Sequence, residues 1–111
     1  MAAFFTACGL ELTADQIEPL QLVRYTGGEY FGPHHDYHST GKSSVQGEQR
    51  VFTLLLFGST VSADAGGETH FPELGVHVWP RGGDALAWSN VDAHGAHERR
   101  VPVNARARPP P

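Results

Sequence analysis

The chain has little cysteine, little positive charge and no long apolar run, and each shortage excludes a class of protein. Among its 111 residues Cys8 is the single cysteine, which excludes an internal disulfide and a cysteine-rich zinc module. Lysine and arginine number 8 against 12 acidic residues, so no basic field would attract nucleic acid or an anionic membrane. No hydrophobic stretch approaches the roughly 18 residues that a membrane span requires. The opening stretch MAAFFTACG lacks the basic start of a signal peptide, and we assign no compartment.

Glycine and proline are abundant instead, with 13 and 8 residues, and they favour short strands joined by turns within one small domain. Thr13 followed by Gln16 has the spacing of a capping box, which predicts one short helix that ends near Pro19. Apolar and alternating segments predict strands at residues 20–25, 50–58, 76–80, 85–88 and 99–103. Short strands after one helix predict a mainly β fold, a sandwich or barrel of jelly-roll type.

Three of these segments carry more specific predictions. Residues 50–58 become continuously apolar, which is typical of a strand buried on both faces. Residues 76–80 and 85–88 flank the Gly-Gly turn at 81–84, which predicts a hairpin. The final NARARPPP is predicted to be a tail outside the sheets, because proline lacks the N–H that pairing requires.

The stretch GPHHDYHS, residues 32–39, concentrates imidazoles around one carboxylate. In an extended segment, side chains two positions apart share a face, so His34, Asp36 and His38 would lie on one side. An imidazole and a carboxylate there supply two ligands of a 2-His-1-carboxylate triad, which leaves positions open on Fe(II). A polar loop without metal is the more ordinary explanation of so short a pattern. The residues of this stretch alone leave both interpretations open.

Two longer blocks occur in a particular order: RYTGGEYFGPHHDYH and then GGETHFPELGVHVWPRGGDALAW. Their sequence resembles the catalytic domain of the prolyl 4-hydroxylases, which are Fe(II)- and 2-oxoglutarate-dependent dioxygenases, from about Leu20 to Val103. The resemblance implies a double-stranded β-helix (jelly roll) with a short N-terminal helix, and an incomplete one, because the family domain has further elements at both ends. We therefore expect an N-terminal stub at 1–19, a dioxygenase domain at 20–103 and an Arg/Pro-rich tail at 104–111.

The resemblance also implies an iron-ligand set. His34 and Asp36 match the first two ligands of the family, and His97 is the best match to the third. The family has three residues between that histidine and a Pro-Val, whereas HERRVPV has four between His97 and Pro102, an excess that a β-bulge would absorb. His94 is the alternative third ligand.

The resemblance implies a second set of residues for 2-oxoglutarate, whose far carboxylate needs a cation. The family uses a lysine beyond the Pro-Val. Counting five residues past Val103 reaches Arg108, with Arg106 as the alternative and a solvated tail residue as the competing interpretation. Tyr25 matches a family tyrosine that donates to 2-oxoglutarate, although a core tyrosine would fit the pattern as well. Thr69 stands where the family places another hydroxyl.

The activity implied by the resemblance is hydroxylation of a peptidyl proline, coupled to decarboxylation of 2-oxoglutarate to succinate. O₂ is then a co-reactant, ascorbate restores oxidised iron, and the partner is a proline-containing peptide or protein. The alternative is a non-catalytic, degenerate metal-binding β-barrel of the same fold, and a weaker one is a related dioxygenase for another amino acid or a nucleobase. His70 and His77 fit the ligand pattern poorly, and we expect them to be exposed polar residues.

Overall fold

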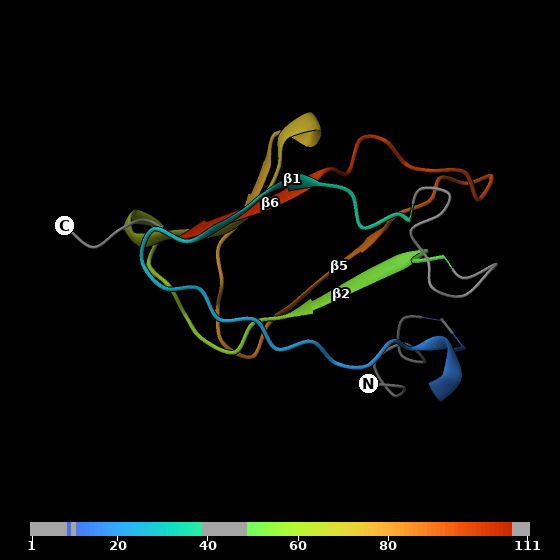
Figure 1. The fold of residues 1–111 in the computed structure, drawn as a ribbon, viewed down its shortest axis with the longest axis horizontal. Helices are drawn as coiled ribbons and strands as arrows, with labels where there is room; N and C mark the ends of the chain where they lie inside the picture. Colours follow the sequence, from blue (N-terminus) through green and yellow to red (C-terminus); the bar gives the residue numbers. More distant parts are fainter. Residues whose placement is uncertain (1–8, 10, 39–48, 108–111) are drawn as a thin grey trace.

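The computed structural model describes residues 9, 11–38 and 49–107, which form two antiparallel β-sheets in two layers (Figure 1). The larger sheet has the strand order β1-β6-β3-β4, and the smaller one pairs β2 with β5. No helix of the described residues is long and apolar enough to cross a membrane. The elements in chain order are η1 (Ala14–Gln16), β1 (Tyr30–His34), β2 (Phe52–Leu56), η2 (Ala63–Ala65), β3 (Gly66–Phe71), η3 (Pro72–Leu74), β4 (Val76–Val78), β5 (Ala85–Ser89) and β6 (Val103–Ala107).

The predicted capping box is present, but it closes one 3-10 turn rather than a longer helix. The backbone N–H of Thr13 donates to Oε1 of Gln16 at 2.9 Å, as the spacing predicts. The backbone is already extended at Ile17. Pro19 follows two residues later and cannot continue a helix, because its ring fixes φ and it has no N–H to donate.

The strand predicted at residues 20–25 does not form, and this prediction is wrong. The segment has no ladder partner within the described part of the chain, and Leu22 and Val23 are 96% and 61% exposed. The strand at residues 50–58 does form as β2, but it is half-buried rather than buried on both faces, with Leu56 53% exposed. Alternation indicates an extended backbone, whereas burial depends on partners that the local sequence does not supply.

The predicted hairpin between residues 76–80 and 85–88 is also wrong, because β4 and β5 belong to different sheets. β4 pairs with β3, and β5 pairs with β2. The turn at 81–84 is fastened to the end of β2, where Phe57 accepts from the N–H of Gly83 and donates to the carbonyl of Asp84. The chain passes from the larger sheet to the smaller one between β4 and β5, so adjacency in sequence does not imply pairing here.

The sequence pattern predicted neither central strand of the larger sheet, and it did not predict the edge strand β1. β3 begins within a predicted loop, and β6 covers residues 104–107 of the predicted tail while lying between β1 and β3. The tail prediction is therefore wrong for residues 104–107, and residues 108–111 lie outside the described part. The first proline of the tail is Pro109, so every residue from Val103 to Ala107 retains the N–H that pairing requires.

The core lies between the two sheets and is small. Its buried apolar side chains are Phe71, Val101 and Val103, and Leu86 and Trp88 of β5 pack against them. Phe71 and Trp88 meet edge to face, with their ring centroids 5.2 Å apart. This contact joins β3 of the larger sheet to β5 of the smaller one, so the two layers share one core.

Candidate metal centre

The His-x-Asp pair lies where β1 ends. The register between β1 and β6 shifts between Phe31 and His34, and His34 is paired with Val103. Asp36 follows two residues later in a bend, and its Oδ1 lies 3.3 Å from Nε2 of His34. The two side chains are 30% and 16% exposed. The structure therefore places the imidazole and the carboxylate side by side and half-buried.

A backbone hydrogen bond orients the His34 ring. Its Nδ1 lies 2.8 Å from the carbonyl oxygen of Gly32. Because a carbonyl can only accept, Nδ1 must carry the proton, and in the neutral ring Nε2 is then a bare acceptor. That acceptor faces Oδ1 of Asp36, a second acceptor. A cation satisfies both atoms, either a proton on Nε2 or a metal ion between them, and a metal-bound histidine commonly has this Nδ1–H to carbonyl bond.

The other oxygen of the Asp36 carboxylate is held by a chain of polar side chains. Oγ1 of Thr53 donates to Oδ2 of Asp36 at 2.8 Å, and Nδ2 of Asn90 donates to Oγ1 of Thr53 at 2.9 Å. Asn90 is 1% exposed. Sequence reasoning missed both Thr53 and Asn90, because a hydrogen bond between distant positions leaves no spacing pattern.

The His97 side chain contacts His35 and Tyr37 rather than His34 or Asp36. Its Nε2 is 3.1 Å from Nδ1 of His35, and its ring stacks on Tyr37 with centroids 4.4 Å apart. Desolvation, and after it the nearby His35, lowers the pKa of His97, which favours the neutral ring. As placed, no three histidine, cysteine, aspartate or glutamate side chains among the described residues could hold a metal ion. The alternative ligand, His94, is exposed in a turn where its N–H donates to Asp92.

Of the residues expected to bind 2-oxoglutarate, the structure describes the side chains of Thr69 and Tyr25. Thr69 lies in β3 and is 3% exposed, on the same strand face as Phe71. Tyr25 is 40% exposed, and desolvation followed by the charge of Glu29 raises its pKa. Arg108 lies outside the described residues, and for Arg106 the backbone alone is described, with Tyr30 as its partner on β1.

The remaining histidine pair lies across β3 and β4. His70 and His77 are directly paired, and their rings stack with centroids 3.9 Å apart. His70 is half-buried and His77 is exposed. Since Thr69 and Phe71 are buried on the core side, the alternation of the strand places His70 on the outer face.

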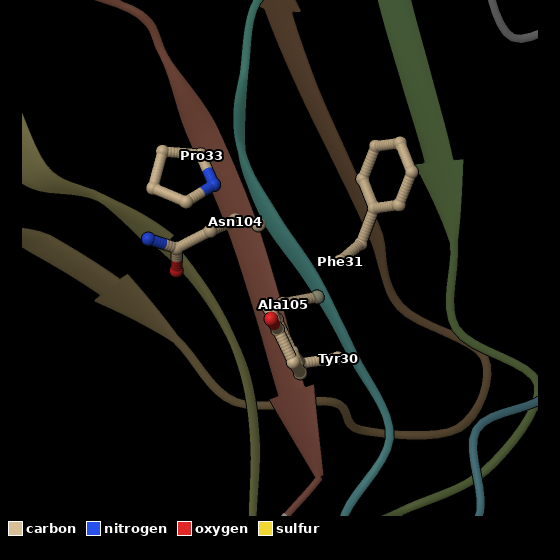
Figure 2. Close-up of a pocket in the computed structure, with 6 residues that line it drawn as sticks. Tyr30, Phe31, Pro33, Asn104 and Ala105 are labelled. Atoms are coloured by element: carbon tan, nitrogen blue, oxygen red, sulfur yellow. The ribbon is translucent and has the colours of Figure 1, made fainter.

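A shallow pocket of about 190 Å³ lies against β1 and β6 (Figure 2). Figure 2 shows Phe31 on the side of β2 and β5, with Pro33 and Asn104 on the other side of the two strands. The lining has no histidine, carboxylate or thiol, so this pocket is not the metal site. Its residues are Tyr30, Phe31, Gly32, Pro33, Asn104 and Ala105.

An antiparallel jelly roll with an imidazole–carboxylate pair at a strand end is consistent with the class of non-haem iron oxygenases. Residues 20–107 match the 2OG-Fe(II) oxygenase superfamily, and the chain belongs to this family. It is 38% identical over 88 residues to human prolyl 4-hydroxylase subunit alpha-1. This alignment covers 76% of this chain and 16% of that protein. A putative prolyl 4-hydroxylase of Acanthamoeba polyphaga mimivirus is 38% identical over 81 residues, 67% of this chain and 32% of that protein. The chain thus spans a third or less of the length of these two relatives.

A solved structure shows the same fold. The viral collagen prolyl hydroxylase of Paramecium Bursaria Chlorella virus-1, in its 2-oxoglutarate complex, matches with a TM-score of 0.64 at 22% identity. The match covers 78% of this chain and 49% of that one. The family resemblance and the mainly β, jelly-roll fold expected from the sequence are confirmed.

The described residues fit a ferrous ion in part. Nε2 of His34 and Oδ1 of Asp36 form a mixed nitrogen and oxygen donor pair that suits Fe(II), and their other polar atoms are already hydrogen-bonded. The third donor is the part that does not fit as placed, since Nε2 of His97 is directed at His35.

Proposed function

We propose that this chain is the catalytic part of a 2-oxoglutarate-dependent dioxygenase that hydroxylates proline in a peptide or protein. The hydroxylation would be coupled to decarboxylation of 2-oxoglutarate to succinate, with O₂ as co-reactant. Family membership supports the reaction type, and the names of the relatives support proline as the substrate. The observation that carries the proposal is the close approach of His34 Nε2 and Asp36 Oδ1, 3.3 Å apart, beside a His34 ring fixed through its Nδ1.

His34, Asp36 and His97 would hold Fe(II), with His97 rotating away from His35 to become the third ligand. When bound, the ferrous ion supplies the place where 2-oxoglutarate and O₂ react, and ascorbate would keep it reduced. The carbonyl of Gly32 holds the His34 ring so that Nε2 stays free for the metal.

Tyr25, Thr69 and Arg108 would bind 2-oxoglutarate, with Arg106 as the alternative to Arg108. A guanidinium suits a carboxylate because it can donate two parallel hydrogen bonds. The burial of Thr69, which is 3% exposed, supports this role, because a hydrogen bond to the cosubstrate would be stronger where water is excluded.

The test is a turnover assay with the purified chain, Fe(II), 2-oxoglutarate, ascorbate and a proline-rich peptide. Wild type is expected to form succinate and to add one oxygen atom to the peptide, as seen by mass spectrometry. Asp36→Ala is expected to do neither, whereas Leu74→Ala, which changes an exposed side chain outside the proposed sites, should match wild type. Hydroxylation by Asp36→Ala at the wild-type rate would refute the assignment.

A non-catalytic metal-binding β-barrel is the second candidate, and the direction of His97 toward His35 is the observation that favours it. Charge reversal at Arg108 separates the two candidates. In an enzyme, Arg108→Glu should raise the 2-oxoglutarate concentration needed for turnover. In a binding protein, wild type would bind metal without forming succinate, and Arg108→Glu would leave metal binding unchanged.

A further inference from the structure

We infer that Thr53 and Asn90 are positioning residues that fix the Asp36 carboxylate so that one oxygen alone, Oδ1, is presented to the metal. The inference rests on the proposed metal site at His34 and Asp36. It assigns a role to two side chains, Thr53 in β2 and Asn90 just after β5, that would not touch the metal themselves.

The direction of the hydrogen bonds is set by the chemistry of the three groups. An amide nitrogen can only donate, so Nδ2 of Asn90 donates to Oγ1 of Thr53 at 2.9 Å. The single proton of the Thr53 hydroxyl is then free for Oδ2 of Asp36, at 2.8 Å. The reverse orientation of the amide would draw that proton toward Asn90 and leave Oδ2 without its donor. These two hydrogen bonds therefore occupy Oδ2 of Asp36 and leave its Oδ1 facing His34.

The backbone of Asn90 connects these hydrogen-bonded side chains to the rest of the site. Its N–H donates to the carbonyl of Val51 at 2.9 Å, just before β2. Its carbonyl accepts from the N–H of Glu98 at 3.0 Å, next to His97. One residue thus links the start of β2, the carboxylate of Asp36 and the segment that carries the proposed third ligand.

The burial of Asn90 supports a role that only its amide nitrogen can perform. The side chain is 1% exposed, and its Oδ1 has no hydrogen-bond partner among the described residues. An unpaired buried oxygen is unfavourable, so an apolar side chain would suit this position better if packing were its task. An aspartate could not donate to Thr53 at neutral pH, since an ionised carboxylate only accepts.

The experiment measures Mn(II) binding by the EPR signal of the free ion, which does not depend on turnover. Thr53→Val keeps the shape of the side chain and removes the hydroxyl, and Thr53→Ser keeps the hydroxyl. Loss of a hydrogen bond to a metal ligand typically weakens binding about 10- to 100-fold, and we expect Thr53→Val in this range. Thr53→Ser should bind within a factor of about three of wild type, since its donor is retained.

The thermal midpoint of the metal-free protein separates positioning from folding. A merely structural Thr53 would lower that midpoint and leave the Mn(II) affinity of the folded protein unchanged. If Thr53→Val does not fold, Thr53→Ala tests the same bond. Wild-type Mn(II) affinity in the folded variant, while Asp36→Ala loses binding, would overturn the inference alone. Wild-type affinity in Asp36→Ala would instead overturn the proposed metal site.

Discussion

Removing the His35 imidazole should strengthen metal binding, because His35 holds the proposed third ligand away from the other two. Nε2 of His97 lies 3.1 Å from Nδ1 of His35, and this contact must break before His97 can reach a metal shared with Asp36. A net hydrogen bond is worth about 0.5–1.5 kcal/mol. Without that cost, the dissociation constant for Mn(II) should fall by a factor of about 2 to 12 in His35→Ala, since 1.4 kcal/mol is about tenfold.

The assay is the same Mn(II) titration followed by EPR, with the variant and wild type at equal protein concentration. Tyr37→Phe is the matched control, because it keeps the ring that stacks on His97 at 4.4 Å and should leave the affinity unchanged. If His35→Ala binds Mn(II) more weakly than wild type, His35 supports the metal rather than competing for His97. The proposed rotation of His97 would then be wrong.

Two further predictions concern the stability of the fold. Phe71→Ala should lower the free energy of unfolding by about 3–5 kcal/mol in a urea titration, because the ring is 4% exposed and joins the two sheets through Trp88. Leu74→Ala, at a side chain 47% exposed, should change it by about 0.5 kcal/mol or less, and equal losses in the two variants would mean that the sheets share no core. Glu18→Gln should cost about 1 kcal/mol or less at neutral pH, because the pair with Arg50 is largely exposed. The hydrogen bond from Arg50 lowers the pKa of Glu18. The stability that this pair contributes should therefore be present above the ordinary glutamate pKa and be lost as the pH falls through the lowered pKa of the folded protein. A stability difference between Glu18→Gln and wild type that persists at about pH 2 would contradict this origin.

The sequence predicted features that depend on neighbouring residues better than those that depend on distant ones. The capping box of Thr13 and Gln16 and the proximity of His34 and Asp36 follow from separations of three and two residues, and the structure contains both. Asp36 lies in a bend beyond β1, so the short separation, rather than alternation along one strand, keeps the imidazole and the carboxylate together.

Strand pairing was predicted poorly, because each partner comes from elsewhere in the chain. β6 was hidden by the arginines and prolines that surround it, although its backbone can pair from Val103 to Ala107. The segment at 20–25 has the right alternation but no partner within the described residues, so its apolar side chains stay exposed.

The site was only partly predictable for a related reason. Thr53 and Asn90 meet across 37 positions, and a hydrogen bond of that separation leaves no signature in the local sequence. The direction of the His97 ring depends equally on a distant partner, His35. Residue types and spacing indicate which groups are available, whereas tertiary contacts decide how each side chain is directed.

The most direct test of the central claim is an absorbance spectrum recorded without oxygen after Fe(II) and 2-oxoglutarate are added to the purified chain. Chelation of iron by the keto acid within an intact site produces a visible metal-to-ligand charge-transfer band. We predict this band for wild type and its loss in Asp36→Ala. A wild-type spectrum with no band, or an equal band in Asp36→Ala, would contradict a ferrous site built on His34 and Asp36.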